Sequence, residues 1–236
     1  MDFAFPLSAA VPGVHGRVLA VLARSGLPQT GKRIAEMAGT SVEQTRQVLL
    51  RMSESGLVES RRAGQAVLYE SNPRHLLWPS IERLVIEADQ ALWAVKRRVS
   101  MKIDDLVASA DAARVTAALF GSVARGDARP DSDVDILLIT PDEFAEFLVE
   151  ALVLGVIREV EAATGNDCNI YQVSRERFDE LVQYRDPMVQ SLATDADVFH
   201  GPHFRRRLTG GPWDEPGTPH PTTTESGPLP HASTSR

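Results

Sequence analysis

The sequence predicts an α/β protein of two domains, and three observations lead to this prediction. Three amphipathic helical segments and a pair of alternating runs come first, a long helical stretch follows, and apolar strands then alternate with helices. A chain of 236 residues is long enough for two domains. The hydrophobic content of 43% and the charged content of 24% are ordinary for a globular protein.

Composition excludes several classes of protein. No run of about 18 apolar residues is present, so no membrane span is expected. The first residues lack the basic and apolar regions of a secretory signal. The single cysteine, Cys168, excludes an intrachain disulfide and fits a reducing, cytoplasmic location. The net charge of −7 hides an asymmetry, because residues 13–75 contain nine Lys or Arg against five Asp or Glu.

Residues 13–75 predict a domain of three helices and a β-hairpin. Thr30 is placed to cap the second helix, which stops at Gly39. Ser41 is placed to cap the third helix, which runs to Gly56. The runs LVESRR and AVLYES then alternate between apolar and polar residues, as the two strands of a hairpin do.

This order of elements resembles the winged helix-turn-helix domain of bacterial regulators of the MarR or ArsR kind. The resemblance implies double-stranded DNA as a partner, with the third helix in the major groove and the hairpin against phosphates or the minor groove. The DNA-binding residues expected from it are Ser41, Gln44, Arg46, Gln47, Arg61 and Arg62. The alternative is a small helical domain whose polar face is only solvated.

Residues 79–106 predict one long linker helix. Its apolar positions step by four and three residues, which is a heptad seam about three repeats long. The seam consists of Ile81, Val85, Ala88, Leu92, Val95 and Val99. It either pairs with a second subunit, giving a homodimer, or packs on its own neighbours.

Residues 209–236 contain six Pro, four Gly and nine Ser or Thr, and we expect this tail to be disordered.

Residues 107–208 predict the second domain, and its chemistry lies in the stretch LFGSVARGDARPDSDVDILLIT. The apolar run before Gly121 and Ser122 predicts a strand, and the helix start that follows has free N–H groups suited to a phosphate. Asp133 and Asp135 lie on one face of the next strand, about 6.6 Å apart along it. Two carboxylates so close repel each other, and oxygen ligands favour Mg²⁺ or Mn²⁺ between them.

The pattern G-S-x-x-R-G followed by S-D-x-D resembles the minimal nucleotidyltransferase domain of the DNA polymerase β superfamily. The residues in register are Gly121, Ser122, Arg125, Gly126, Ser132, Asp133 and Asp135. The resemblance implies transfer of a nucleoside monophosphate from a nucleoside triphosphate (NTP) to an acceptor hydroxyl, with release of pyrophosphate. It assigns the nucleotide to Gly121, Ser122, Arg125 and Ser132 and the metal to Asp133 and Asp135. Arg125 either neutralises phosphate or pairs with a carboxylate and braces its helix.

The resemblance also implies a third acidic residue on a later strand, and here the sequence departs from the pattern. Counting back from Ser174 places that position at Asn169, which is neutral. Asp167 reaches it only if the strand shifts by about 6.6 Å, which is large for a metal ligand. We therefore expect Asn169, with Asp167 as the alternative. An amide cannot act as a base, so its presence weakens catalysis before it weakens nucleotide binding.

Three functions fit these patterns. The first is an enzyme that transfers a nucleotide to a small molecule, a protein side chain or an RNA end. The second is a DNA-binding transcriptional regulator whose nucleotidyltransferase-like domain senses a nucleotide or binds a partner. The third is an antitoxin-type nucleotidyltransferase that acts on a toxin-like partner protein.

Overall fold

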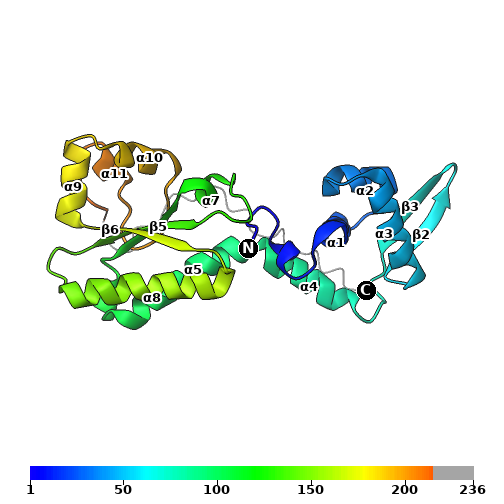
Figure 1. Cartoon of the computed structure of the whole chain (residues 1–236), viewed down its shortest axis with the longest axis horizontal. Helices are drawn as coiled ribbons and strands as arrows, with labels where there is room; N and C mark the ends of the chain where they lie inside the picture. The colour runs from blue at the N-terminus through cyan, green and yellow to red at the C-terminus, as the bar shows by residue number, and fades with distance from the viewer. Residues whose placement is uncertain (215–236) are drawn as a thin grey trace, which may run out of the picture.

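The computed structural model describes residues 1–214, which form two lobes joined by consecutive helices (Figure 1). We call residues 5–89 the N-terminal lobe and residues 91–214 the C-terminal lobe. The first residues of the chain contact the C-terminal lobe, where Phe3 packs on the core and the Met1 carbonyl accepts from Nδ2 of Asn166 at 3.2 Å. Each lobe contains helices and a β-sheet, so the predicted α/β class is confirmed. None of the helices in the described part of the chain combines the length and the apolar character that a membrane span requires.

The N-terminal lobe is a helical bundle with a three-stranded sheet in the order β1-β3-β2. Its elements are η1 (Pro6–Ala9), α1 (Gly13–Ser25), β1 (Gln29–Thr30), α2 (Gly31–Ala38), α3 (Val42–Glu54), β2 (Val58–Ala63), β3 (Ala66–Ser71) and α4 (Trp78–Asp89). The predicted caps are present, because the Thr30 hydroxyl accepts from the Arg33 amide and the Ser41 hydroxyl from the Gln44 amide, each at 3.2 Å. Strands β2 and β3 form the predicted antiparallel hairpin.

Helix α4 is anchored to the N-terminal lobe. Its first residue, Trp78, is buried in the same core as Ile34 and Leu49 of α2 and α3. Further along α4, Val85 packs with Leu7 of η1 in a smaller cluster. Helix α4 is therefore part of the N-terminal lobe and is not an unpacked linker.

The single helix predicted over residues 79–106 is two helices in the structure. Helix α4 ends at Asp89, and α5 (Ala91–Leu106) begins after Gln90. The Gln90 amide is shared between the carbonyls of Ile86 and Glu87, each at 3.2 Å, which is the bifurcated pattern of a helix end. Nothing in the residue types around Gln90 indicates this break.

The predicted apolar seam lies inside the molecule. Val85 is buried in the N-terminal lobe, and Val95 and Val99 are buried in the C-terminal lobe. Of the two arrangements that the sequence left open, the structure shows packing on the chain's own neighbours. A second subunit, if there is one, must use another face.

The C-terminal lobe is built on a four-stranded mixed sheet in the order β6-β5-β4-β7. Its remaining elements are α6 (Ser109–Ala112), β4 (Thr116–Phe120), α7 (Gly121–Arg125), β5 (Val134–Thr140), α8 (Glu146–Thr164), β6 (Cys168–Ser174), α9 (Arg175–Gln183), α10 (Pro187–Asp195), β7 (Asp197–His200) and α11 (Arg205–Leu208). Strands β5 and β6 are parallel and are connected through α8, whereas β4 is antiparallel to both of its neighbours. Helices cover both faces of this sheet (Figure 1).

The two faces of the sheet have separate cores. Ile136 and Leu138 pack toward α5 and α8, and Leu137 and Ile139 pack toward α9 and α10. Because side chains alternate along a strand, Asp135 shares the face of Leu137 and Ile139. The aspartates therefore lie on the side of the sheet that α9, α10 and α11 cover.

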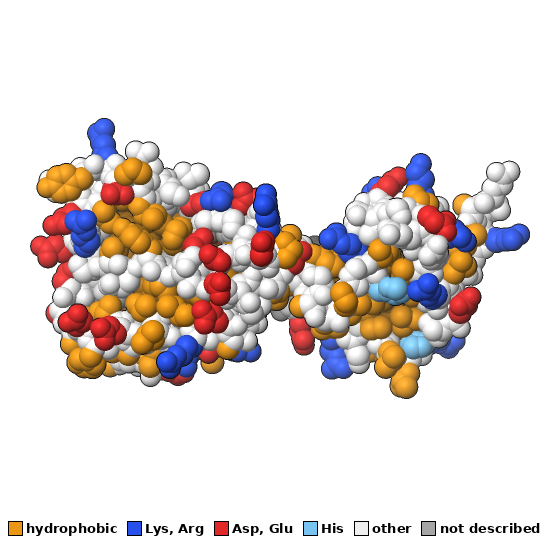
Figure 2. Space-filling view, viewed as in Figure 1, with side chains coloured by type: hydrophobic (Ala, Val, Ile, Leu, Met, Phe, Trp, Pro, Cys, Tyr) orange, Lys and Arg blue, Asp and Glu red, His pale blue; other side chains and the backbone are white. Residues whose placement is uncertain are grey.

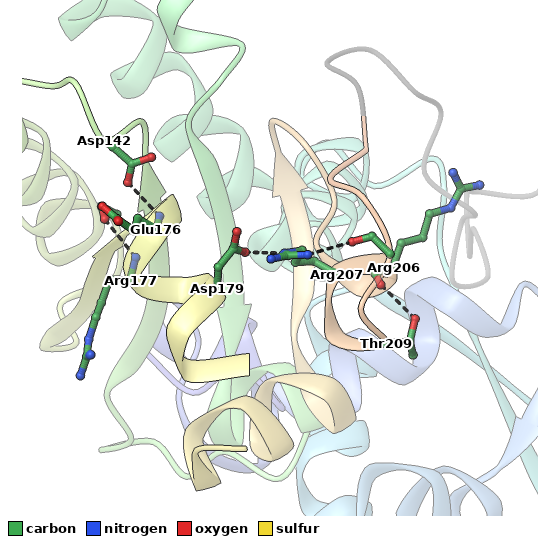
Figure 3. Close-up of polar contacts among 9 residues, drawn as sticks. Asp142, Glu176, Arg177, Asp179, Arg206, Arg207 and Thr209 are labelled. Atoms are coloured by element: carbon green, nitrogen blue, oxygen red, sulfur yellow. Dashed lines mark hydrogen bonds and ion pairs between the residues drawn. The ribbon is translucent and has the colours of Figure 1, made fainter. Parts of the chain in front are cut away.

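The predicted disordered tail needs a correction at its start. Trp213 packs on Phe178 of α9, with ring centroids 5.5 Å apart. Just before the tail, Arg207 donates to Asp179 of α9 at 2.5 Å, and the hydroxyl of Thr209, the first residue of the predicted tail, donates to the Arg206 carbonyl at 2.9 Å (Figure 3). Residues 209–214 are thus held against α9, and the rest of the predicted tail, residues 215–236, lies outside the described residues.

Candidate active site

Three polar side chains meet where β5 and β6 begin. Asp135 of β5 is paired with Phe120 of β4 on one side and with Asn169 of β6 on the other. Asp133 lies two residues earlier, on the same face. The Nδ2 of Asn169 donates to Oδ2 of Asp133 at 3.0 Å and to Oδ1 of Asp135 at 3.3 Å. One neutral amide therefore lies between two carboxylates.

Asp167, the alternative to Asn169, contributes its backbone to this region. Its carbonyl accepts from the Val134 amide at 2.9 Å, and Cys168 is then paired with Val134 in the parallel register. Asp135 is paired with Asn169 in this register, so Asp167 lies two residues before the position next to the aspartates. The position that faces the two aspartates is therefore the neutral one.

Gly121 lets the chain turn directly beside Asp135. Its φ of +74° lies in the left-handed region that favours glycine. A Cβ at this position would lie 2.4 Å from Oδ2 of Asp135, which is closer than any real Cβ contact. The start of α7 and the aspartate strand are thus in contact through a position that only glycine can occupy.

Ser122 and Arg125 follow on α7, and only Ser122 is near the turn. Ser122 is half-buried in the first turn of the helix. Arg125 is in the last turn, where its Nη1 donates to Oδ2 of Asp195 on α10 at 2.7 Å and its Nε approaches Asp127 at 3.4 Å. The hydrogen bond with Asp195 raises the pKa of Arg125. Arg125 is thus paired with carboxylates in the structure, and its contact with a phosphate stays a prediction.

Ser132 belongs to the loop that leads into the aspartate strand. Its hydroxyl accepts from the Arg129 amide at 2.8 Å, which closes a turn. The buried Asn166 holds the same loop, since its Nδ2 donates to the carbonyls of Pro130 at 3.3 Å and Ser132 at 2.9 Å. The hydroxyl of Ser132 thus shapes the loop, and Asn166 fixes the approach to Asp133.

The cluster fits a divalent cation that completes its shell with other oxygens. Asp133 and Asn169 are exposed and Asp135 is half-buried, so the cluster is open to solvent. Carboxylate and amide oxygens are ligands that Mg²⁺ and Mn²⁺ accept. No group of three or more His, Cys, Asp or Glu suited to a metal occurs among the described residues. Two carboxylates suit Mg²⁺, which usually keeps several waters or phosphate oxygens.

The residues predicted to bind DNA begin on α3 of the N-terminal lobe. Its outward side chains contact each other, because Arg46 donates to Glu43 through Nε at 3.0 Å and Nη2 at 2.9 Å. Gln47 also donates to Glu43, at 3.1 Å, and the Ser41 hydroxyl lies 3.1 Å from the side-chain oxygen of Gln44. The hydrogen bonds from Arg46 and Gln47 lower the pKa of Glu43 to about 2.

The hairpin extends this exposed surface. Arg61 lies 3.8 Å from Glu70 on the neighbouring strand, and Arg62 is also exposed. Figure 2 shows Lys and Arg side chains around the N-terminal lobe and at its hairpin, whereas Asp and Glu side chains gather on the C-terminal lobe. The charge asymmetry expected from the sequence is therefore also a difference between the two lobes.

Two residues next to the site were missed in the sequence. Asp195 has a side chain only 4% exposed, and its Oδ1 has no hydrogen-bond partner among the described residues. Asn166 is buried and supports the loop before Asp133. Neither belongs to the recognised pattern, and each acts on a segment far away in the sequence. A buried carboxylate or amide facing another segment is visible only in the fold.

Comparison with protein families agrees with the geometry of the C-terminal lobe. Residues 100–186 match the family model described as a nucleotidyltransferase domain. This stretch is therefore similar to nucleotidyltransferase domains over 87 of the 236 residues. It contains β4, α7, β5, α8 and β6, and with them the whole aspartate cluster.

Two further comparisons identify no related protein on which an argument can rest. A search of curated protein sequences found no match. The structure of TrmBL2, an archaeal chromatin protein, aligns with 14% identity over 76% of this chain and 71% of that chain, with a TM-score of 0.25. A TM-score at this level does not establish a shared fold.

Proposed function

We propose that the nucleotidyltransferase domain transfers a nucleoside monophosphate from an NTP to an acceptor hydroxyl with the help of Mg²⁺ or Mn²⁺. The observation that carries this proposal is the contact between the Gly121 turn and Asp135, with Asp133 on the same face. A phosphate-binding turn and a pair of metal-binding carboxylates are then adjacent. These are the two parts that phosphoryl transfer needs, since positioning and charge stabilisation supply most of its catalysis.

Each residue has a defined task in this reaction. The acceptor oxygen attacks the α-phosphorus, the bond to the pyrophosphate oxygen breaks, and the hydroxyl proton passes to solvent or to a carboxylate. Ser122 and neighbouring backbone N–H groups hold the triphosphate. Asp133 and Asp135 hold the cation, which when bound stabilises charge on the phosphate oxygens. Asn169 orients both carboxylates but cannot take the proton.

The test is incubation of the protein with Mg²⁺ or Mn²⁺ and each labelled NTP, alone and with candidate acceptors. We expect metal-dependent pyrophosphate release that is lost in Asp133→Asn. The matched control is Asp131→Asn, which removes the same charge from the exposed loop two residues earlier. Release that survives Asp133→Asn, or that falls equally in both variants, would contradict the assignment.

A second function is favoured by Asn169, namely nucleotide sensing without turnover. The amide satisfies both aspartates, so the cluster is stable without a third acid, and the loss of a base affects catalysis more than binding. NTP binding by calorimetry, with no pyrophosphate release for any NTP, metal or acceptor, would select the sensor over the enzyme.

For the N-terminal lobe, we propose DNA binding in a regulatory setting, through Gln44, Arg46 and Gln47 of α3 and Arg61 and Arg62 of the hairpin. The supporting observation is that these side chains are exposed on one helix and one hairpin of the more basic lobe. Fluorescence anisotropy on promoter DNA should show binding that weakens with salt and in Arg46→Ala. Arg158→Ala, which removes an exposed arginine of α8, is the control and should bind as the wild type does.

A further inference from the structure

The buried side chain of Asn166 joins two segments that are far apart in the sequence. Its Nδ2 donates to the carbonyls of Pro130 at 3.3 Å and Ser132 at 2.9 Å, in the loop before Asp133. The same Nδ2 donates to the Met1 carbonyl at 3.2 Å, and Oδ1 accepts from the Met1 nitrogen. The two hydrogens of Nδ2 are thus shared among three carbonyls, and the partner of Oδ1 comes from Met1.

The backbone of Asn166 is fixed to the end of α8. Its amide donates to the Thr164 hydroxyl at 3.1 Å, and that hydroxyl donates to the Val160 carbonyl at 2.8 Å. Thr164 and Val160 are both buried. Because the backbone is held, the direction of the side-chain amide depends on its partners in the loop and at Met1.

Residues 1–5, which we call the strap, connect the two lobes. Phe3 packs on the core of the C-terminal lobe. Phe5 packs in the cluster around Val85 of the N-terminal lobe, and the Cζ of Arg17 on α1 lies 4.7 Å from the centroid of its ring. Figure 1 places the N-terminus between the two lobes. The strap is therefore a second connection between the lobes, in addition to the one through α4 and α5.

The strap is a tight turn. The Asp2 carboxylate accepts from the amides of Ala4 at 3.0 Å and Phe5 at 3.2 Å, and the Asp2 carbonyl accepts from the Phe5 amide at 3.1 Å. Ala4 alone separates the residue that packs on one lobe from the residue that packs on the other. A change in the angle between the lobes therefore moves Met1 relative to Asn166.

We propose that Asn166 is a positioning residue for Asp133, and that the strap sets the direction of its side chain from the N-terminal lobe. The Met1 nitrogen on Oδ1 fixes which way the amide faces, and so keeps Nδ2 toward the loop carbonyls. The Asp133 carboxylate then keeps its place beside Asp135. Mg²⁺ requires near-ideal geometry at about 2.0–2.1 Å, so a small shift of one carboxylate weakens its binding. This role rests on the proposed function, which assigns the cation to the two aspartates, whereas the contact between strap and loop stands without it.

Hydrogen exchange of the full chain tests the contact without metal or nucleotide. Phe3→Ser should raise exchange at the hydrogen-bonded amides of Arg129, Ser132 and Val134 about fivefold, the effect of losing one ordinary hydrogen bond. Phe144→Ser is the matched control, because Phe144 packs on the same core but follows the other end of β5. Unchanged exchange in Phe3→Ser, or an equal rise in both variants, would overturn the proposal.

Phe5→Ser tests the connection to the N-terminal lobe. It removes the ring that contacts Arg17 and leaves Phe3 and Met1 in place. Exchange at the same three amides should rise about two- to fivefold, which corresponds to the loss of one exposed cation–π contact. A rise in Phe3→Ser without one in Phe5→Ser would make the strap a local support and overturn its part in joining the lobes.

Mn²⁺ binding, measured by electron paramagnetic resonance, tests the effect on the aspartates. Phe3→Ser and Asn166→Ala should each weaken binding about fivefold, and Phe144→Ser should bind as the wild type does. The double variant of Phe3 and Asn166 should be no weaker than either single variant, because the strap acts through Asn166. Additive losses would overturn the proposal. A wild type that binds no Mn²⁺ would contradict the proposed function and the positioning role together, whereas unchanged exchange in Phe3→Ser contradicts the strap alone.

Discussion

The outward face of α3 and the aspartate cluster are assembled in opposite ways. On α3, Arg46 and Gln47 are oriented by Glu43, three and four residues away on the same helix. In the cluster, Asp135 contacts Gly121 and Asn169, which come from other segments of the chain. Contacts between neighbouring residues of one helix orient the side chains of α3, whereas the register of the strands brings the residues of the aspartate cluster together. Single substitutions should therefore have small effects on α3 and large effects in the cluster.

The largest effect is expected from Gly121→Ala. The new Cβ would lie 2.4 Å from Oδ2 of Asp135 at a φ of +74°, so the turn and the aspartate must move apart. A displacement of about 1 Å at a reacting centre can reduce turnover by about 100-fold, and we expect at least this loss of pyrophosphate release. Gly126→Ala is the control, since it has a φ of +78° and no atom within 4 Å of the new Cβ. Equal losses in both variants would show that backbone strain alone is responsible.

Asn169→Asp should act in the opposite direction. A carboxylate beside Asp133 and Asp135 supplies a base and a metal ligand, and general base catalysis contributes about 100-fold or more. We expect pyrophosphate release to rise by about tenfold, and the melting temperature without metal to fall because three carboxylates then repel each other. Asp167→Asn should leave the rate unchanged. An unchanged rate in Asn169→Asp would indicate that a missing base does not limit the reaction.

Asp195→Asn should loosen α7 without touching the aspartates. It replaces the buried carboxylate that holds Arg125 at 2.7 Å, and loss of a charged hydrogen bond lowers the free energy of unfolding by about 1–3 kcal/mol. Asp127→Asn removes the exposed partner of the same arginine and should cost less than about 0.5 kcal/mol. Urea unfolding measures both variants, and hydrogen exchange should rise across residues 121–125 only in Asp195→Asn.

Glu43→Gln should have a smaller effect, on DNA binding. It releases Arg46 and removes a negative charge that would face phosphates, so we expect DNA affinity to rise about two- to fivefold. Glu54→Gln, at the exposed end of the same helix, is the control. Unchanged or weaker binding in Glu43→Gln would place the DNA elsewhere.

Because the pKa of Glu43 is lowered to about 2, this carboxylate stays ionised at any pH used for DNA binding. A depressed pKa in the folded state stabilises the fold above the ordinary value near 4.3, and this contribution is lost as the pH falls toward 2. Lowering the pH from 8 to 5 should therefore not reproduce the effect of Glu43→Gln.

The smallest effect concerns Cys168. Burial raises the pKa of this thiol to about 12, so maleimide should label it slowly at pH 8 and rapidly after unfolding. A raised thiol pKa stabilises the folded state fully below the unfolded value near 8.5, and this contribution falls as the pH rises toward 12. Fast labelling of the folded protein at pH 8 would contradict the burial of this strand.

Features set by neighbouring residues were predictable from the sequence. The caps at Thr30 and Ser41 and the hairpin follow from residue type and spacing, and the structure contains them. The position of Asn169 followed from counting within one strand, and the structure places it in register with Asp135. In each case the signal lies within a few residues of the feature.

Features set by distant residues were not predictable. The contact of Asp195 with Arg125 joins two helices that lie far apart in the chain, and the side chain of Asn166 holds a loop from the far end of α8. The ordered structure of residues 209–214 depends on the contact between the rings of Trp213 and Phe178. Proline and glycine content indicated disorder there, but a single large aromatic contact outweighs local composition.

The break at Gln90 lies between α4 of the N-terminal lobe and α5 of the C-terminal lobe. The 12 residues of α4 span about 18 Å, and both of its ends are bound to the N-terminal lobe, Trp78 in the core and Asp89 through an ion pair with Arg24 of α1. A rotation of about 10° at Gln90 would carry α4 and the helices packed on it together, and would move the far end of α4 by about 3 Å. For the DNA binding proposed for α3, such a rotation would correspond to about one step of 3.4 Å between base pairs.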